Sequence, residues 1–275
     1  MKKVLLTGAS GQLGRALTVE LSRESDILAL SHGQLDITDY VAVRDCLRHH
    51  RPDWVINTAA WTDVDAAESD PRSALAANAL GPRHLAAVCE QVGIPLVQIS
   101  SDYCFDGVLN RPLHEFDATN PLSVYGRSKW LGEEEVRRHH SRHLILRTAW
   151  LYHVSGRNFP LTILGLARKG PLRVVDDQVG SPTFAPHLAV LIPRLMREGC
   201  FGTWHTAGSG AVSWYELTLA LLQRAGVSCE VTPVTTEAFP RPARRPAFSA
   251  LTTFLPPELR LPSWEEGVAD FVAGI

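Results

Sequence analysis

Tyr125 and Lys129 are the residues whose types and spacing best suit catalysis. They stand four residues apart in a segment, 123–140, whose pattern predicts a helix, so both side chains should share one face of it. An ammonium beside a phenol favours the phenolate, so Lys129 should lower the pKa of Tyr125 toward working pH and speed proton exchange with a substrate oxygen. Such pairs also occur on solvated helices, so the elements around this one decide whether it is catalytic.

A glycine-rich turn near the start of the chain predicts a dinucleotide site. An apolar run at 3–6 leads into Gly8, Gly11 and Gly14, and a helical pattern of leucines follows. These glycines would allow a tight turn, close approach of a pyrophosphate and packing of a helix on a sheet, while the helix N-terminus offers free N–H groups to phosphates. The alternative is a turn of the same composition that binds no ligand.

Strands and helices alternate along the first half of the chain, which predicts an α/β fold. Strands are expected at 27–30, 54–56, 96–99 and 143–146, and helices around 39–49, 71–92 and 123–140. They should form a doubly wound parallel sheet of the Rossmann type, whose ligands lie beyond the carboxyl ends of the strands. Two polar segments, 57–62 and 100–103, follow strands at that edge. In the second half, Ser213 and Glu216 form a capping box that predicts a further helix.

Composition argues against several functional classes. The chain has 275 residues and a net charge of −2, and its pI is about 6.6, so no basic surface for nucleic acid is indicated. No apolar run is long enough to span a bilayer, and the run after Met1-Lys2-Lys3 is too short for a secretory signal, which favours a cytoplasmic location. Five cysteines without C-x-x-C spacing indicate reduced thiols, and the histidine pairs lack partner carboxylates at metal-ligand spacing.

Motifs of a known superfamily stand along almost the whole chain. One set comprises Gly8-x-x-Gly11-x-x-Gly14, Ser100-Ser101-Asp102-Tyr103 and Pro121-Leu122-Ser123-Val124-Tyr125-Gly126-x-Ser128-Lys129. A second set comprises Leu35-Asp36-Ile37-Thr38-Asp39, Asn57-Thr58-Ala59-Ala60-Trp61-Thr62, Arg147-Thr148-Ala149-Trp150, Asp177-Gln178-x-Gly180-Ser181-Pro182-Thr183 and Arg245-Pro246-Ala247-Phe248-Ser249-Ala250-Leu251. With the first set the chain resembles the extended short-chain dehydrogenase/reductases. With the second it resembles, more narrowly, the dTDP-4-dehydrorhamnose reductase family.

The resemblance implies a reaction, the NADPH-dependent reduction of the C4 ketone of dTDP-4-dehydro-L-rhamnose to dTDP-L-rhamnose. Tyr125 would give its proton to the ketone oxygen, Lys129 would hold the ribose and keep the phenol acidic, and Ser101 would hydrogen-bond the same oxygen. The family usually has threonine at position 101, and serine keeps the hydroxyl. Asp102 would bind or orient the sugar, or else serve as a structural cap.

The resemblance also implies binding residues and a division into domains. Cofactor contacts would come from Gly8, Ser10, Gly11, Gln12, Leu13, Asp36, Ile37, Ala59, Ala60, Thr62, Tyr125 and Lys129. Substrate contacts would come from Ser101, Asp102, Tyr103, Trp150, Asn158, Gln178 and Arg245. For Trp150 and Asn158 the alternative is a packing or loop role. The dinucleotide-binding domain would comprise 1–150 and 183–206, and a smaller α/β substrate-binding domain would comprise 151–182 and 207–275.

The end of the second predicted strand favours NADPH as the cofactor. NAD-specific folds place a carboxylate there to bind the ribose 2′-OH, but this chain has Ser31-His32. No carboxylate is present at this position to repel a 2′-phosphate. In addition, Arg15, which follows the last glycine of the turn, carries a positive charge that could attract it. NADPH is therefore expected, with NADH as a tolerated alternative.

Two departures from the family pattern affect the prediction. Ala16 stands where the branch with a magnesium-bridged dimer has glutamate, so we expect no structural metal and a monomer or weak homodimer. Phe248 replaces the usual asparagine of the closing motif, so a related dTDP-4-keto-6-deoxy sugar is an alternative substrate.

Two other classes compete with the reductase. The motifs after residue 147 argue against an epimerase or dehydratase of the same superfamily. The pair of Tyr125 and Lys129 favours an enzyme over a non-catalytic NADP-binding regulatory subunit of the methionine adenosyltransferase type, and that alternative stays open.

Overall fold

The fold is built on a parallel sheet. The computed structural model describes residues 3–275, so Met1 and Lys2, which open the segment considered above for a secretory signal, lie outside it. Within the described residues the six-stranded sheet has the order β10-β5-β4-β3-β1-β2, and each neighbouring pair is parallel. Its strands are β1 (Lys3–Thr7), β2 (Asp26–Leu30), β3 (Trp54–Asn57), β4 (Leu96–Ser101), β5 (His143–Thr148) and β10 (Gly202–His205). The predicted parallel α/β sheet is confirmed.

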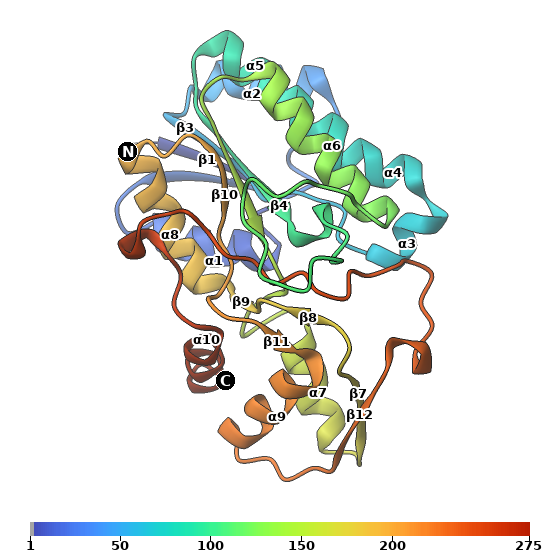
Figure 1. Cartoon of the computed structure of the whole chain (residues 1–275). Coiled ribbons are helices and arrows are strands. Elements are labelled where there is room, and N and C mark those ends of the chain that lie inside the picture. Colours follow the sequence, from blue (N-terminus) through green and yellow to red (C-terminus); the bar gives the residue numbers. More distant parts are fainter. Residues whose placement is uncertain (1–2) are drawn as a thin grey trace.

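Helices cover both faces of this sheet (Figure 1). One face carries α1 (Gln12–Leu21) and α8 (Ala185–Glu198), and the other carries α2 (Tyr40–His50), α5 (Gly81–Val92) and α6 (Val124–His139). Strand β1 shows the alternation that makes this possible, because Val4 and Leu6 pack in the core with α1 and α8, whereas Leu5 packs with α2 and α5. The sheet is therefore doubly wound, as the sequence predicts.

The strand order reverses at β1, which lies between β2 and β3. In open α/β sheets, ligands bind beyond the carboxyl ends of the strands at such a point. The glycine turn that follows β1 and the segment 58–62 that follows β3 both lie there. The topology thus puts the predicted cofactor residues at the ligand-binding edge of the sheet.

The helical stretch expected at 71–92 is not one helix. It consists of α4 (Pro71–Leu75), a π-helical turn (Ala76–Leu80) and α5, after the short helix α3 (Val64–Ser69). The wide turn brings the Asn78 amide to Ser128 Oγ on α6 at 2.9 Å and to the Trp61 carbonyl oxygen at 3.0 Å. Gly132 of α6 makes room for it, because a Cβ there would lie 2.1 Å from the Asn78 carbonyl oxygen. Close packing of α6 therefore explains the break.

The remaining elements form a smaller α/β part, below the sheet in Figure 1. Its strands and helices are β6 (Leu151–Tyr152), α7 (Phe159–Ala167), β7 (Leu172–Val175), β8 (Val179–Gly180), β9 (Thr183–Phe184), β11 (Val212–Ser213), α9 (Trp214–Arg224), β12 (Val231–Val234) and α10 (Trp264–Ala273). Strand β8 pairs with β11, β7 with β12, and β6 with β9. The predicted capping box at Ser213 is present and opens α9. Short 3₁₀ turns stand at Asp102–Cys104, Thr236–Ala238 and Pro257–Leu259.

Most of segment 183–206 lies with the large sheet, although β9 at its start pairs with β6 of the smaller part. Helix α8 packs against α1, and β10 pairs with β5 at one edge of the sheet. These contacts support the proposed division, in which 1–150 and 183–206 bind the dinucleotide while 151–182 and 207–275 bind the substrate.

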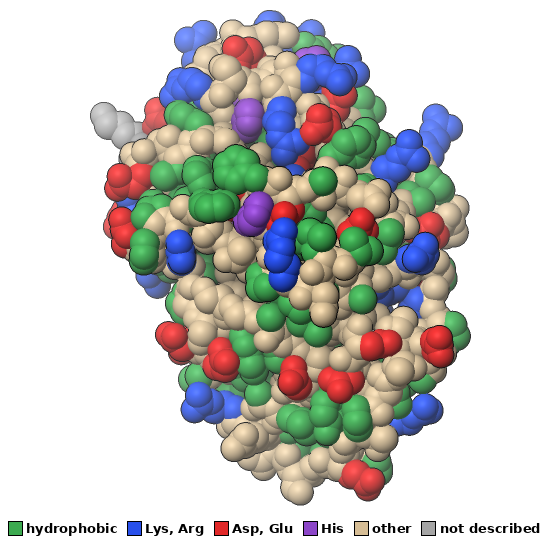
Figure 2. All heavy atoms as spheres, viewed as in Figure 1, with side chains coloured by type: hydrophobic (Ala, Val, Ile, Leu, Met, Phe, Trp, Pro, Cys, Tyr) green, Lys and Arg blue, Asp and Glu red, His purple; other side chains and the backbone are tan. Residues whose placement is uncertain are grey.

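Within residues 3–275, no helix has the length and apolar character needed to cross a membrane. The five cysteines are free thiols. Acidic and basic side chains are interspersed over the face shown in Figure 2. In the described part of the chain no three His, Cys, Asp or Glu side chains are grouped to hold a metal ion, and Ala16 is buried in the core with α8.

Candidate active site

Helix α6 positions the two residues predicted to move a proton. Its N-cap, Ser123, accepts a hydrogen bond from the Gly126 N–H at 3.1 Å, so Tyr125 stands in the first turn. Lys129 follows one turn later on the same face. Glycine is required at 126, because a Cβ there would lie 2.3 Å from the Tyr103 carbonyl oxygen. This close approach holds Tyr125 beside the end of β4.

The end of β4 brings a hydroxyl and a carboxylate to the same place. The Ser101 hydroxyl lies close enough to the Tyr125 phenol to affect its pKa. It also donates to Asp102 Oδ1 at 3.0 Å and accepts from the Tyr103 N–H at 3.2 Å. The other carboxylate oxygen, Asp102 Oδ2, accepts from the Ser249 hydroxyl at 2.6 Å. The predicted catalytic residues Ser101 and Tyr125 are therefore neighbours, and the Asp102 carboxylate fixes the serine hydroxyl through a hydrogen bond.

Burial controls the proton affinities of these groups. It raises the pKa of Tyr125 above its usual range and outweighs the effect of Ser101, which lowers that pKa. The lowered phenol pKa expected from the sequence is therefore wrong for this structure, because desolvation disfavours the phenolate more than its neighbours favour it. Burial also raises the pKa of Asp102 to about 6, against the hydrogen bonds from Ser249 and Ser101.

Lys129 is anchored to the strand that ends at Ser101. Its side chain is buried, and Nζ donates to the Ile99 carbonyl oxygen on β4 at 2.7 Å. Burial lowers the pKa of the ammonium to about 8, and the nearby Cys104 and Glu133 act in the opposite direction. The protonated, positively charged form of Lys129 therefore still predominates at neutral pH. A positive charge near Tyr125 would stabilise the phenolate that forms when Tyr125 gives up its proton.

A pocket of about 690 Å³ opens on the side of the smaller part. Its wall includes Asp106, Asp177, Arg244, Arg245 and Phe248. Arg245 connects the pocket to the catalytic groups, because its guanidinium lies beside the Tyr103 side chain, and the Tyr103 ring meets the Tyr125 ring edge to face with centroids 5.4 Å apart. Phe248, which departs from the family pattern, lies in the same wall.

The guanidinium of Arg245 already has a carboxylate partner. Its two terminal nitrogens bond Asp65 Oδ1 at 3.0 Å and Oδ2 at 2.9 Å. Gln178, another predicted substrate residue, is buried and donates to Thr236 Oγ1 at 2.9 Å. Arg245 therefore lines the pocket, whereas Gln178 does not line it, although its chain neighbours Asp177 and Val179 do.

Trp150 and Asn158 are placed away from that pocket. Trp150 has a φ of +46°, and its indole stacks on Trp214 with ring centroids 3.4 Å apart. Asn158 caps α7 by accepting from the Leu161 N–H at 3.0 Å, and its amide donates to Gln12 Oε1 at 3.0 Å. Trp150 therefore packs within the smaller part, whereas Asn158 bridges that part to the glycine turn. Their roles toward the substrate stay predictions.

The turn after β1 has the geometry of a phosphate site. Gly8 has a φ of +70°, and a Cβ on it would lie 2.5 Å from the Ala59 backbone nitrogen. Helix α1 begins after Gly11, which has no side chain to cap the first N–H groups, so these stay open to an anion. Ser10 is exposed in this turn, and Leu13 is buried beneath it.

The other predicted cofactor residues follow β2 and β3. Asp36 accepts from the Thr38 N–H at 2.9 Å and from its hydroxyl at 2.8 Å, and the backbone hydrogen bond lowers the pKa of that carboxyl. Ile37 is buried against Gly81, where a Cβ would lie 2.5 Å from Ile37 Cδ1. At the end of β3, Ala59 and Ala60 are partly exposed and Thr62 is exposed. These residues line the edge where the topology predicts a ligand.

Three residues for which the sequence predicts no role in the site are connected to the catalytic groups in the structure. Ser249 bonds Asp102, and Asp65 bonds Arg245. Glu133 lies one turn after Lys129 on α6, with both side chains buried. Two of these residues could have been found from the sequence. Ser249 stands in the closing motif at 245–251, and Glu133 stands four residues after Lys129 in the predicted helix.

Comparison with known proteins places this site in a family. The family model described as the RmlD substrate binding domain matches residues 1–275. The dTDP-4-dehydrorhamnose reductase of Streptomyces griseus is 43% identical over 256 residues, which cover 90% of this chain and 84% of that protein. The dTDP-4-keto-6-deoxy-D-glucose reductase of Streptomyces niveus is 39% identical over 251 residues, which cover 90% of this chain and 87% of that protein.

A solved structure gives the same result over the full length. The dTDP-4-dehydrorhamnose reductase of Bacillus anthracis in complex with NADP matches with a TM-score of 0.97 and 38% identity, and the match covers 100% of both chains. The chain therefore belongs to the dTDP-4-dehydrorhamnose reductase family of the extended short-chain dehydrogenase/reductases.

Proposed function

We propose that this chain catalyses the NADPH-dependent reduction of the C4 ketone of dTDP-4-dehydro-L-rhamnose to dTDP-L-rhamnose. The observation that carries the proposal is the meeting of Ser101, Tyr125 and Lys129 at the carboxyl end of β4. Full-length similarity to reductases of this name supports the substrate, and the NADP complex of the Bacillus anthracis relative supports the cofactor.

The residues present fit a nicotinamide dinucleotide. Open N–H groups at the start of α1 suit its pyrophosphate, and the absence of a Cβ at Gly8 leaves the turn flat against Ala59. After β2, the Ser31 hydroxyl bonds Gln34 and presents no charge to a 2′-phosphate. NADPH is the favoured cofactor, and when bound it supplies the hydride for the ketone carbon.

Tyr125 acts as the proton donor in this reaction. Reduction of the ketone requires that the Tyr125 phenol is protonated before hydride transfer. Because burial raises the pKa of Tyr125, the phenol keeps its proton until negative charge develops on the ketone oxygen. Ser101 donates a second hydrogen bond to that oxygen once its hydroxyl turns away from Asp102 Oδ1. The ammonium of Lys129 then stabilises the phenolate that remains.

The pocket beside Tyr103 is the proposed site of the nucleotide sugar. Its volume of about 690 Å³ lies in the range of small-molecule sites. Arg244 in its wall suits the diphosphate, because a guanidinium can bond two phosphate oxygens at once, and Arg245, whose terminal nitrogens bond Asp65, adds positive charge beside it. Asp102, which faces Ser101 and Ser249, would orient the serine and accept from a sugar hydroxyl.

A second candidate is the reduction of a related dTDP-4-keto-6-deoxy sugar. Two observations favour it: the relative from Streptomyces niveus is named for dTDP-4-keto-6-deoxy-D-glucose, and Phe248, a departure from the family motif, lies in the pocket wall. Both candidates use the same catalytic groups and differ only in the stereochemistry of the sugar.

The cellular setting is also part of the proposal. Five free thiols are typical of a reducing compartment, which supports a cytoplasmic enzyme. The buried position of Ala16 supports a monomer or weak homodimer without a bridging metal, since that side chain faces α8 in the core.

A substrate panel tests the proposal. Oxidation of NADPH is followed with dTDP-4-dehydro-L-rhamnose and with other dTDP-4-keto-6-deoxy sugars, and the configuration of each product at C4 is assigned. The proposal predicts the highest kcat/KM for dTDP-4-dehydro-L-rhamnose. A higher value for another sugar would select the second candidate, and no turnover with any of them would favour a non-catalytic NADP-binding protein.

A further inference from the structure

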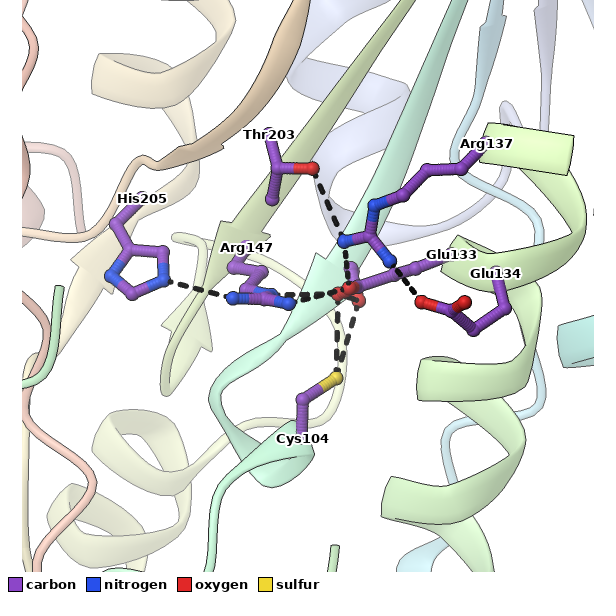
Figure 3. Close-up of polar contacts among 8 residues, drawn as sticks. Cys104, Glu133, Glu134, Arg137, Arg147, Thr203 and His205 are labelled. Carbon is purple, nitrogen blue, oxygen red and sulfur yellow. Dashed lines mark hydrogen bonds and ion pairs between the residues drawn. The ribbon is translucent and has the colours of Figure 1, made fainter. Parts of the chain in front are cut away.

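A buried cluster of polar side chains surrounds Glu133, one helical turn after Lys129 on α6, and the proposed mechanism does not use it (Figure 3). At its centre is Glu133, whose side chain is 0% exposed. Figure 3 shows side chains from α6, β5, β10 and the turn after β4 pointing toward this carboxylate. A charged group so deep in the protein requires compensation, so its position calls for an explanation.

Every oxygen of Glu133 has hydrogen-bond donors. Oε1 accepts from Ser100 Oγ at 2.6 Å and from Arg147 Nε at 2.8 Å, and the Cys104 thiol lies 3.4 Å away. Oε2 accepts from Arg147 Nη2 and from Arg137 Nη2, each at 2.7 Å. Burial alone would raise the pKa of this carboxyl, but Arg147, Arg137 and Ser100 together outweigh burial and hold that pKa at about 2. Glu133 is therefore an ionised carboxylate at working pH.

The bond to Ser100 links the cluster to the catalytic strand. Lys129 bonds the carbonyl of Ile99, and Glu133, one turn later on α6, bonds the side chain of Ser100. Two side chains of one helix thus hold two consecutive residues of β4, and the next residue of that strand is Ser101. The same helix carries Tyr125 in its first turn. The two bonds therefore set the position of α6 along β4.

We propose that Glu133 is a positioning residue for the reductase: by bonding Ser100 on β4 from a place one helical turn beyond Lys129 on α6, it holds Tyr125 in register with Ser101. This inference rests on the proposed function. It goes beyond a structural ion pair with Arg147, because a purely structural pair would not affect the ionisation of Lys129.

The charges around the cluster determine the sign of the effect. Lys129 is buried, and Glu133 opposes the loss of its proton. The other charged groups that face the carboxylate are the cations Arg147 and Arg137, while burial lowers the pKa of His205 to about 4, so that imidazole is neutral. Cys104 also opposes the loss of the Lys129 proton, and Glu133→Gln leaves that residue unchanged. Removal of the Glu133 charge should therefore ease deprotonation of Lys129.

The first test is the pH dependence of kcat/KM in three variants. Glu133→Gln should lower kcat by about tenfold to a hundredfold and move the alkaline limb to lower pH, as expected for a displaced and less charged catalytic pair. Ser100→Ala removes the bond to β4 and keeps the charge, so it should lower kcat without moving the limb. Glu134→Gln is the matched control, because Glu134 is partly exposed and pairs only with Arg137 among the residues in Figure 3.

The second test reads the ionisation of Lys129 without turnover. The chain has lysines only at 2, 3, 129 and 169, so NMR titration of ¹³C-labelled lysine can follow each of them. Glu133→Gln should lower the pKa of Lys129, and Glu134→Gln should leave it unchanged. An unchanged Lys129 titration in Glu133→Gln, or wild-type kcat in Ser100→Ala, would overturn the inference. If Glu133→Gln does not fold, as judged by circular dichroism, the kcat of Ser100→Ala decides. Absence of turnover in the wild type would instead contradict the proposed function, and the titration would still test Glu133.

Discussion

Arg245 and Asp65 form a two-pronged ion pair, with Nη1–Oδ1 at 3.0 Å and Nη2–Oδ2 at 2.9 Å, between residues 180 positions apart in the chain. The arginine belongs to the closing motif of the smaller part, and the aspartate belongs to α3 beside the large sheet. Because the planar guanidinium matches a carboxylate at two points, the pair fixes its orientation as well as its position. Arg245 is thereby held in the pocket wall next to Tyr103.

Loss of the Asp65 carboxylate should weaken substrate binding more than chemistry. In Asp65→Asn the guanidinium loses its charged partner and can leave the wall, so KM for the nucleotide sugar should rise by about tenfold, as expected for one charge-assisted hydrogen bond, while kcat changes little. Steady-state kinetics measure both constants, with KM for NADPH as an internal reference. Arg241→Gln is the control, since Arg241 lies 3.9 Å from the same carboxylate and is exposed. An unchanged KM in Asp65→Asn would show that the pair does not hold the site.

Replacement of Tyr125 by phenylalanine should remove the proton donor and little else. The ring and its edge contact with Tyr103 remain, so NADPH affinity, measured by nucleotide fluorescence, should stay near that of the wild type. Turnover should fall by about a hundredfold to ten-thousandfold, the usual contribution of a positioned acid. Substantial residual turnover in Tyr125→Phe would assign the proton transfer to another group.

The pH dependence of kcat/KM should reveal the buried ammonium of Lys129. Burial lowers the pKa of that group to about 8, so its positive charge is present below this pH and is lost as the pH rises through it. The rate should therefore decline on the alkaline side of about pH 8. Lys129→Arg, which cannot lose its proton in this range, should be slower but should lack the decline. A wild-type plateau that continues far above pH 8 would contradict the assignment.

The contact between α6 and the turn after β4 depends on Gly126. A Cβ there would lie 2.3 Å from the Tyr103 carbonyl oxygen, so Gly126→Ala should push the helix away and displace Tyr125. We expect kcat to fall by about tenfold to a hundredfold, because small displacements of reacting groups have effects of that size. Gly165→Ala is a matched helical control with no atom within 4 Å of the added Cβ. It should keep full activity and gain about 0.5–1 kcal/mol in the free energy of unfolding, measured by urea denaturation. Equal activity of the two variants would show that α6 tolerates the displacement.

Local patterns predicted strands β1 to β5 of the large sheet and several helices, whereas β10 was expected only from the resemblance to the family. The apolar run before Gly8, the helix that carries Tyr125 and the capping box at Ser213 depend on residues close together in the sequence, and each was found where the pattern put it. The break of the 71–92 helix was not predicted, because it arises from packing of Asn78 against Gly132 of a later helix.

Contacts between distant residues account for what the sequence did not predict in the site. Ser249 reaches Asp102 across 147 positions, and no local pattern reports such a meeting. The pKa of Tyr125 was predicted with the wrong sign because the spacing to Lys129 was visible in the sequence, whereas the burial of the phenol depends on the whole fold. Spacing identifies which groups can interact, but the surrounding packing decides their ionisation.

Isotope transfer tests the central claim most directly. The protein is incubated with dTDP-4-dehydro-L-rhamnose and NADPH that carries deuterium at the transferable position of the nicotinamide, and the product is analysed by NMR. The account predicts one deuterium at C4 of dTDP-L-rhamnose and an equal amount of NADP formed. A product without deuterium at C4, or conversion of the sugar without net oxidation of NADPH, would contradict it.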